Sequence, residues 1–414
     1  MKTCSGRTLE QRIEEHEYHP EIYIYPTPRM YRPLHELRHV ELIYTKRLNV
    51  YIHVPFCTHF CTFCGYFKTI YNEALQEEFV DAVLSEIRMR AAAFKDKLIR
   101  TLHFGGGTPS LLTAKQLQKI LNALREVRPD ILETCEEVSM EATPESIEGA
   151  KFRGYQELGV NRVSMGVQSL VDAEVALANR CLEKDRSSFR MLQEAFDTLR
   201  GCGLNDIVVD LMIGIEGQTR ATFLESLEKT ITLRPRTVQL YALGVMPQSA
   251  LGRRQPTGLL SGREIYACYQ TAYHLLTDAG YRRDSHDRYT LHPVNGFLQG
   301  DLNIQGTSLI GLGAGARSYS EGLHFRNIYS SQNGRKALME YIRLMKGGLS
   351  AVESGVHLTL DERCRQYAIG HLRELNLNEF ARRFGEPFQV KFSSLYESML
   401  RLELASVEDS VLKL

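Results

Sequence analysis

The chain has 414 residues, of which 43% are hydrophobic and 24% are charged, and its 50 basic side chains match its 50 acidic ones. This composition is typical of a globular protein, and the length predicts one large domain together with a smaller one. A formal net charge of zero argues against a nucleic acid or an anionic membrane surface as partner, so we expect a small-molecule substrate.

Two further features indicate the compartment. No stretch approaches the roughly 18 uninterrupted apolar residues of a membrane-spanning helix, and residues 1–15 lack the apolar segment of a signal peptide. Three of the nine cysteines are clustered and the others are scattered, which is not the pattern of a disulfide framework. We therefore expect a cytoplasmic protein without a membrane-spanning helix, and we expect it to be a monomer.

Residues 1–45 predict an N-terminal arm. Tyr, Pro, His and Arg are frequent there, and three prolines occur between Pro26 and Pro33. Because proline disfavours regular helices and central strands, this arm is expected to be extended and to lie over a larger body.

From Leu48 onward, apolar runs rich in β-branched residues alternate with helical patterns. Strands are predicted at residues 48–54, 101–104, 137–141, 162–167, 207–213 and 238–243. Helices are predicted at residues 75–94, 114–127, 145–158, 187–200, 220–233 and 263–279. Six strands that alternate with helices imply right-handed crossovers and a parallel sheet, so we expect an α/β fold with a partial (β/α)6 barrel of the TIM type.

This partial barrel is expected to span residues 46–285. Residues 286–350 are predicted to cover the site, because the glycine-rich run at 311–316 lets the backbone approach a ligand closely. Residues 351–414 carry helical patterns at 363–375 and 377–384, which predict a small, mainly helical C-terminal domain.

The strongest motif follows the first predicted strand. Cys57, Cys61 and Cys64 have the spacing CxxxCxxC on a short loop. Three thiolates in this arrangement can each bind one iron of a 4Fe–4S cluster, which leaves the fourth iron open to another ligand. Half of a zinc site or a redox motif is the alternative, but the sequence has no second CxxC pair.

Two more features fall where predicted strands end. The run GGGTP at 105–109 is either a plain turn or a shelf of backbone groups for a ligand. Glu141 ends the third strand, where a carboxylate either pairs with a base or accepts hydrogen bonds from ribose hydroxyls. Since the functional residues of parallel sheets gather at the carboxyl ends of the strands, we expect both features near the cysteines.

Five motifs, taken in order, resemble those of the HemN-like branch of the radical S-adenosylmethionine (SAM) enzymes. They are YIHVPFC at 51–57, GGGTP at 105–109, SMGVQS at 164–169, DLMIG at 210–214 and GLGAGARS at 311–318. That branch includes oxygen-independent coproporphyrinogen III oxidase, haem chaperone-like proteins, anaerobic haem-opening methyltransferases, and class C methylases and cyclopropanases. The resemblance implies a 4Fe–4S cluster on the three cysteines, with SAM as the second cofactor.

The family pattern also implies which residues hold two SAM molecules. A first SAM on the open iron is expected to contact Tyr51, Gly106, Glu141 and Arg317. A second SAM beside it is expected to contact Phe63, Gly107, Thr108, Gln168, Arg180, Asp210 and Gly244. Arg180 is the expected partner of a carboxylate, since a guanidinium can donate two hydrogen bonds to one carboxylate group.

One position departs from the family oxidases. Those enzymes carry a fourth cysteine directly after the glycine that follows the cluster motif, whereas this sequence has Tyr66 after Gly65. The difference argues against porphyrinogen decarboxylation and favours transfer of a methyl or methylene group from SAM to an sp2 carbon of a small molecule, by C-methylation or cyclopropanation. Haem cleavage by radical methylation, a coproporphyrinogen dehydrogenase-like activity, and non-catalytic haem binding or delivery stay as alternatives.

Such chemistry needs an electron for the cluster and a group that handles a proton near the acceptor. We expect a flavodoxin- or ferredoxin-type protein to donate the electron. The candidate catalytic residues for the proton are His59, Tyr241, Tyr289 and His292, although each of these residue types is also common in purely structural roles.

Overall fold

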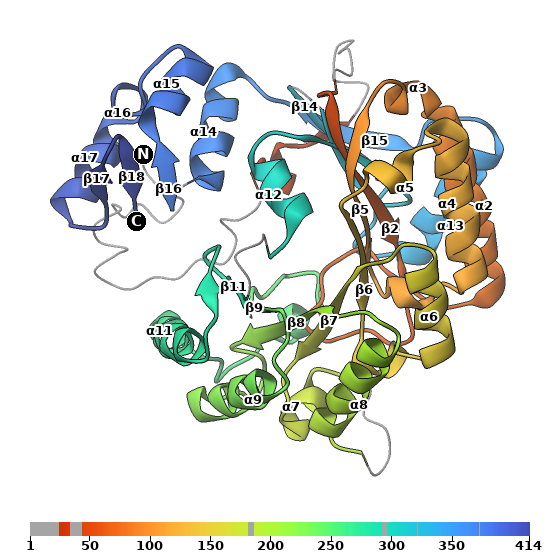
Figure 1. The fold of residues 1–414 in the computed structure, drawn as a ribbon, viewed down its shortest axis with the longest axis horizontal. Helices are drawn as coiled ribbons and strands as arrows, with labels where there is room; N and C mark the ends of the chain where they lie inside the picture. The colour runs from red at the N-terminus through yellow and green to blue at the C-terminus, as the bar shows by residue number, and fades with distance from the viewer. Residues whose placement is uncertain (1–24, 34–43, 181–185, 292–295, 321, 372) are drawn as a thin grey trace.

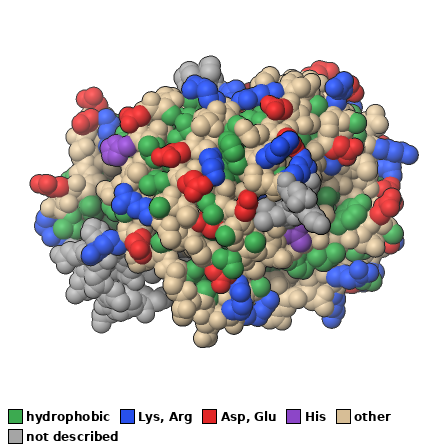
Figure 2. All heavy atoms as spheres, turned by 90° about the horizontal axis from the view of Figure 1, so that it is seen from below, with side chains coloured by type: hydrophobic (Ala, Val, Ile, Leu, Met, Phe, Trp, Pro, Cys, Tyr) green, Lys and Arg blue, Asp and Glu red, His purple; other side chains and the backbone are tan. Residues whose placement is uncertain are grey.

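The structure, a computed structural model, describes residues 25–33, 44–180, 186–291, 296–320, 322–371 and 373–414. Figure 1 shows a curved sheet with helices on its outer face and a smaller unit near the C-terminus. No helix within the described ranges is both long and apolar enough to cross a membrane. Basic and acidic side chains are interspersed over the face that Figure 2 shows, as the balanced net charge leads one to expect.

Parallel strands form the centre of the sheet, in the order β12-β2-β5-β6-β7-β8-β9. They span Arg47–Val54 (β2), Leu98–Gly106 (β5), Glu137–Ala142 (β6), Arg162–Gln168 (β7), Asp206–Ile213 (β8), Thr237–Ala242 (β9) and Ser308–Leu312 (β12). The predicted strands are β2 and β5 to β9, which confirms the α/β fold class. The sequence does not predict β12, because Gly311 interrupts its short apolar run.

Antiparallel strands extend the sheet at both edges and leave it open within the described residues. On the β12 side they are β13 (Arg317–Ser320), β14 (Leu323–Asn327), β15 (Val352–His357) and β1 (Arg32–Pro33), and on the β9 side β11 (Arg288–Thr290) and β10 (Arg282–Arg283). Residues 286–350, predicted as a covering segment, therefore contribute strands to both ends of the sheet. The short strand β1 ties part of the predicted arm to β15.

Helices pack on the outer face of the parallel strands (Figure 1). The longer ones are α2 (Glu73–Met89), α4 (Ala114–Val127), α6 (Gly149–Glu157), α8 (Ser188–Gly201), α9 (Arg220–Thr232), α11 (Gly262–Asp278) and α13 (Gly334–Lys346). Shorter elements are η2 (Pro28–Met30), β3 (Phe56–Cys57), β4 (Thr69–Ile70), α3 (Ala91–Phe94), η4 (Pro109–Leu111), α5 (Ile131–Thr134), η5 (Pro144–Ser146), α7 (Asp172–Leu177), α10 (Ala250–Arg254) and α12 (Leu298–Ile304). The predicted helix at 145–158 begins later, as α6, because Pro144 starts a 3-10 turn.

Short helix α12 closes the inner face of the sheet near the amino ends of its strands. The side chain of Asn49 donates a hydrogen bond of 2.8 Å to Asn303, and Thr101 donates one of 3.0 Å to Gln299. The backbone N–H of Leu298 donates to the carboxylate of Glu137 at 3.1 Å. Because α12 fills this end, a ligand site on the inner face lies toward the carboxyl ends of the strands.

The C-terminal unit has a hydrophobic core of its own, which includes Cys364, Leu375, Phe380 and Phe388. Its elements are α14 (Leu360–Gly370), β16 (Glu374–Asn376), α15 (Leu377–Phe384), α16 (Phe388–Lys391), α17 (Ser393–Arg401), β17 (Ser406–Glu408) and β18 (Val411–Lys413). The predicted helix at 363–375 thus ends at Gly370, and a small sheet in the order β16-β18-β17 accompanies the helices. Strand β15 still belongs to the main sheet, so the unit with the separate core begins at α14.

Candidate active site

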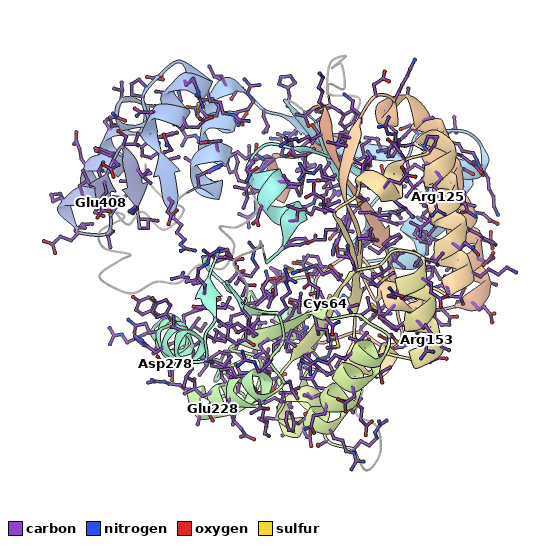
Figure 3. The ribbon with its side chains drawn as sticks, in the orientation of Figure 1. Cys64, Arg125, Arg153, Glu228, Asp278 and Glu408 are labelled. Atoms are coloured by element: carbon purple, nitrogen blue, oxygen red, sulfur yellow. The ribbon has the colours of Figure 1, made fainter. Side chains whose placement is uncertain are left out.

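The cysteine loop begins where β2 meets Pro55 and folds back on itself. Strand β3, which contains Cys57, pairs in parallel with β4, and the Tyr71 N–H donates to the Cys57 carbonyl at 2.9 Å. At the other end of the loop, the Lys68 ammonium donates to the Cys64 carbonyl at 2.6 Å. These bonds join both ends of the loop, and Figure 3 shows Cys64 near the middle of the molecule.

Segments that follow β7 and β9 hold the middle of the loop. The Thr62 N–H donates to the Ala178 carbonyl at 3.0 Å, and the Leu251 N–H donates to the Thr62 carbonyl at 2.8 Å. The Asn179 amide donates to the Phe60 carbonyl at 2.7 Å, from a residue whose φ is 54°. The backbone of the loop is therefore fixed from two sides by other parts of the barrel.

The three thiols of this loop suit a 4Fe–4S cluster. Burial raises the pKa of Cys57 to about 12, and the charges of Cys64 and Cys61 also raise it. A hydrogen bond with Thr108 lowers this pKa, but by less than burial raises it. Among the described residues, no group of side chains converges as the ligands of one metal ion do, and sulfurs that bind different irons of a cluster need not converge in this way. Three soft thiolates are the donor set that iron–sulfur clusters take, so the residues present fit the group.

The glycine run after β5 lies against the cysteine loop. At Gly107, an added Cβ would lie 2.6 Å from the Phe56 carbonyl oxygen and 3.0 Å from the Cys57 sulfur, so no larger residue fits. Gly106 has a φ of +119°, which side chains disfavour, and its N–H donates to Oε2 of Glu141 at 2.9 Å. This close approach to the thiols supports the interpretation of a ligand shelf over that of a plain turn.

Glu141 is held by groups on β5. Nε2 of His103 lies 3.1 Å from Oε1 of Glu141. Nδ1 of the same ring lies 2.6 Å from the Ser139 hydroxyl. Burial raises the pKa of Glu141, but the hydrogen bonds and charge of His103 and the Gly106 N–H outweigh burial and hold it below its usual range. Glu141 thus pairs with a base, one of the two roles that the sequence allowed, and its position beside the glycine shelf is compatible with the other.

Tyr51 lies next to this carboxylate on the inner face. Its ring stacks on that of His103 with 5.7 Å between centroids, and its hydroxyl contacts Nδ1 of His53 at 2.8 Å. The other ring nitrogen of His53 donates to the Phe67 carbonyl at 3.1 Å. His53 therefore has a structural role, because it connects β2 with the end of the cysteine loop.

Asp210 on β8 carries a buried polar atom without a partner. Ser164 donates to its Oδ2 at 3.1 Å, whereas its Oδ1 has no hydrogen-bond partner among the described residues. Burial and then the nearby charge of Glu141 raise the pKa of Asp210 to about 7. A buried oxygen of this kind is an anchoring point for a polar ligand such as a ribose hydroxyl.

The side chains of Gln168 and Arg180 both lie next to Gly166. Gln168 has a φ of 72° at an irregularity in the pairing of β7 with β8, and backbone strain of this kind is frequent at functional sites. Arg180 donates to the Gly166 carbonyl and lies 3.6 Å from the Cys61 sulfur. The structure therefore brings both residues to the side of the site that holds the cysteine loop.

Phe63 and Gly244 lie at the edge of a small apolar cluster. Phe63 packs against the buried residues Met212, Ile215, Leu243 and Leu251. Gly244 is half-buried and directly follows the Leu243 of this cluster. Both predicted residues are thus near the loop after β9, which also contacts the cysteine loop through Leu251.

The side chains of Tyr66 and Tyr241 are exposed, but other protein groups lie close to their hydroxyls. Tyr66 is 61% exposed and Tyr241 is 40% exposed, yet burial by surrounding protein raises the pKa of both hydroxyls. After burial, the charge of Asp210 contributes most to the raised pKa of Tyr241, and the charge of Glu141 raises the pKa of both tyrosines. The charges that act on these hydroxyls place Tyr66 near Glu141, and Tyr241 near both Asp210 and Glu141.

The other candidate catalytic residues have different positions. His59 lies in the cysteine loop, where its ring contacts the Thr58 hydroxyl at 3.0 Å. Tyr289 is 1% exposed and lies opposite Val238 in β9, so it faces the outer side of the sheet, away from Tyr241, because successive strand residues alternate. His292 lies outside the described residues. The structure thus brings His59 and Tyr241 to the site and leaves Tyr289 apart from it.

The sequence does not predict two residues near this site, His103 and Arg326. His103 holds Glu141, and Arg317 lies opposite Arg326 on the neighbouring strand. His103 belongs to none of the five motifs. Its position in the second predicted strand, two residues before the glycine run, indicates that it lies near the site. No such signal marks Arg326, because its strand was not predicted.

Comparison with known proteins agrees with this geometry. The sequence model of the radical SAM superfamily matches residues 51–230. The heme chaperone HemW of Escherichia coli K12 is 30% identical over 276 residues, which cover 65% of this chain and 69% of that protein. The oxygen-independent coproporphyrinogen III oxidase of Salmonella typhimurium is 29% identical over 366 residues (84% of this chain, 76% of that protein). The anaerobilin synthase of Escherichia coli O157:H7 is 29% identical over 310 residues (72% and 68%).

A solved structure shares the fold. The coproporphyrinogen III oxidase HemN of Escherichia coli superposes with a TM-score of 0.78 over 97% of this chain and 94% of that chain, at 23% identity. The motif residues lie together at the carboxyl ends of the parallel strands, and the relatives match over most of the chain. The chain therefore belongs to the radical SAM superfamily, in the branch of HemN and HemW, and its cofactors are a 4Fe–4S cluster and SAM.

Proposed function

We propose that this radical SAM enzyme binds two SAM molecules and transfers a methyl or methylene group to an sp2 carbon of a tetrapyrrole. The observation that carries the proposal is a pair of carboxylates on one inner face. Gly106 and His103 bind Glu141. Asp210, two strands away in β8, has one buried oxygen with no hydrogen-bond partner among the described residues. Two separate acceptors for ribose hydroxyls support two adenosyl groups side by side.

The chain's own residues supply binding and orientation. Cys57, Cys61 and Cys64 hold the cluster, and the backbone of the glycine shelf lies next to the Cys57 sulfur. Arg180, between Cys61 and Gly166, is the proposed partner of the second SAM's carboxylate. When bound, the cluster supplies the electron that splits one SAM to a 5'-deoxyadenosyl radical, and the methyl group of the other SAM supplies the transferred carbon.

Tyr66 favours carbon transfer over decarboxylation. It occupies the position of the oxidases' fourth cysteine and lies near Tyr241, whose pKa its charge helps to raise. A bulky phenol there replaces a small thiol, which changes both the shape of the site and the group available for proton or hydrogen transfer. Tyr241, beside Asp210, is the proposed proton-handling residue, with His59 as the second candidate.

The acceptor class comes from the relatives. Their names refer to a heme chaperone, a coproporphyrinogen oxidase and an anaerobilin synthase. Heme, coproporphyrinogen and anaerobilin are tetrapyrroles or are made from them. A tetrapyrrole also offers several sp2 carbons to a carbon-centred radical. We further propose that the enzyme acts as a monomer and receives electrons from a flavodoxin- or ferredoxin-type protein.

The test is an anaerobic incubation of cluster-reconstituted protein with SAM, a chemical reductant and iron protoporphyrin. The proposal predicts 5'-deoxyadenosine, S-adenosylhomocysteine and an acceptor whose mass has increased by the added carbon. Bound porphyrin without either SAM-derived product would contradict the proposal and favour a haem carrier. Production of 5'-deoxyadenosine without S-adenosylhomocysteine would contradict methyl transfer and favour an oxidase.

A further inference from the structure

Two arginines stand opposite each other on the inner face of the sheet. In the antiparallel pair β13 and β14, Arg317 lies opposite Arg326 and Tyr319 lies opposite His324. Because side chains alternate along a strand, these four share one face. Ser318 and Asn327 lie on the other face, where Arg90 at the end of α2 donates hydrogen bonds to both. The arginine pair therefore faces away from the outer helices.

Strand register joins this pair to the active site. Gly311 of β12 lies beside Tyr51 of β2, and Tyr51 lies beside His103 of β5. A side chain at Gly311 would collide with the Arg317 carbonyl, so the glycine lets β13 approach. The positive charge of Arg317 acts on the hydroxyls of Tyr51 and Tyr66. Arg317 and Arg326 thus continue the row of inner-face residues that contains the proposed SAM contacts.

Among the described residues, the two guanidinium groups have little negative charge near them. Like charges directly opposite in a strand pair destabilise it, and burial followed by the charge of Arg317 lowers the pKa of Arg326. In the described ranges, Arg317 has no carboxylate within 4.0 Å, and Arg326 has only that of Glu353 at 3.8 Å, which is 43% exposed. The side chain of Arg326 is 17% exposed, and its Nε is buried without a hydrogen-bond partner among the described residues.

Aromatic rings hold the arginines in place. Tyr31 lies 5.8 Å from the guanidinium carbons of both Arg317 and Arg326, and the Tyr329 ring lies 4.2 Å from that of Arg326. His324 is 4% exposed, and its Nδ1 has no partner in the part of the chain that the structure describes. Arg317 is hydrogen-bonded to Tyr319, and Arg326 donates to Ser354 at 3.4 Å. Ring faces stabilise a cation without using its N–H donors, so further N–H groups of the pair can donate to an anion.

We propose that Arg317 and Arg326 together bind a carboxylate of the acceptor substrate, such as a propionate side chain of a tetrapyrrole. The inference rests on the proposed function for the identity of that acceptor, but the anion site itself is independent of it. Planar guanidinium groups match a carboxylate with paired hydrogen bonds, and the bound anion removes their mutual repulsion. The sequence predicts Arg317 as a contact of the first SAM. The carboxylate of that SAM is therefore the competing ligand of this pair, and the experiments separate the two sources.

The first experiment measures thermal unfolding of the cluster-reconstituted protein in sodium propionate and in sodium chloride of equal ionic strength. Propionate should raise the Tm of the wild type by roughly 1–2 °C and should not raise that of Arg326→Gln. In chloride, Arg326→Gln should melt at a higher temperature than the wild type, because one of two opposed charges is gone. Arg343→Gln, on the exposed side of α13 and paired only with Glu340 among the described residues, is the matched control and should respond as the wild type does.

Equal propionate shifts in the wild type and in Arg326→Gln would overturn the site. A propionate shift that disappears when SAM is added would also overturn the inference, since the pair would then hold the cofactor's carboxylate. A shift that persists with SAM bound supports a substrate site.

The second experiment compares binding of iron protoporphyrin with that of its dimethyl ester, by absorbance titration in the presence of SAM. The wild type should bind the ester at least about tenfold more weakly, and Arg326→Gln should bind both equally. Equal affinity of the wild type for both forms would overturn the inference. If neither form binds while the propionate shift persists, the tetrapyrrole acceptor of the proposed function is wrong and the carboxylate site stands.

Discussion

The backbone N–H of Gly106 on β5 donates a hydrogen bond of 2.9 Å to Oε2 of Glu141 on the next strand. This bond connects two features that the sequence could only consider separately, the glycine run and the carboxylate at the end of the third predicted strand. His103 binds the other oxygen at 3.1 Å, so Glu141 fixes the shelf against which a SAM molecule is proposed to lie.

Replacing Glu141 by Gln should weaken SAM binding. The amide keeps the shape of the side chain but removes its charge and disturbs the bonds to Gly106 and His103, which predicts a loss in SAM affinity of about tenfold or more. Equilibrium binding of SAM to the reconstituted protein measures it. Glu136→Gln, just before the same strand and paired with Arg100 on the surface, is the matched control. Unchanged affinity in Glu141→Gln would argue against a role of this carboxylate in SAM binding.

Removing one cluster ligand should remove the iron. Cys61→Ala is expected to lose most of its iron and its brown absorbance after reconstitution, because two thiolates do not hold the cluster stably. Iron analysis and the visible spectrum measure this. Cys135→Ala, a half-buried cysteine outside the loop, should keep about four irons per chain. A Cys61→Ala protein with full iron content would show that the cluster is bound elsewhere.

Asp210 should make stability depend on pH. Its pKa rises from 3.8 to about 7 in the fold, so between these values the folded protein holds a proton that the unfolded chain has lost. This contribution to stability is complete below the unfolded pKa and is lost as the pH rises through about 7. Asp210→Asn stays neutral, so its Tm relative to that of the wild type should increase from pH 5 to pH 8. Parallel Tm profiles of the two proteins would contradict the raised pKa.

Arg180 should matter for transfer more than for cluster assembly. Arg180→Gln removes the proposed partner of the second SAM's carboxylate but none of the thiolates. We therefore expect an iron content that differs from that of the wild type by no more than about a fifth. The rate of S-adenosylhomocysteine formation should fall about a hundredfold, as expected when a charge-assisted contact is lost. Quantification of both in parallel tests this. Transfer at the wild-type rate by Arg180→Gln would be incompatible with two bound SAM molecules held in this way.

The sequence predicted the parts of the fold that have simple periodicity. Strands β2 and β8 are rich in buried apolar residues, many of them β-branched, and α4 has a regular apolar stripe with a capping box from Thr113 to Gln116. The cysteine spacing likewise indicates its chemistry without a structure. Local patterns of this kind depend only on residues close in the chain.

Features that depend on distant residues were not predictable. β12 is short and contains Gly311, and its pairing with β2 and β13 is what makes it a strand. β13 and β14 form a hairpin whose register sets Arg317 opposite Arg326, and no local pattern encodes that pair. The sequence predicts Tyr289 as a candidate catalytic residue, but its pairing with Val238, which no local pattern encodes, places its side chain on the outer face.

The central claim is that the transferred carbon comes from the methyl group of a second SAM. Its most direct test uses SAM with a fully deuterated methyl group, incubated anaerobically with the reconstituted protein, reductant and iron protoporphyrin, followed by mass spectrometry of the nucleoside. The two-SAM account predicts 5'-deoxyadenosine that has gained one deuterium. Formation of 5'-deoxyadenosine without any deuterium would contradict it, because the radical would then have taken its hydrogen from the acceptor or from the protein.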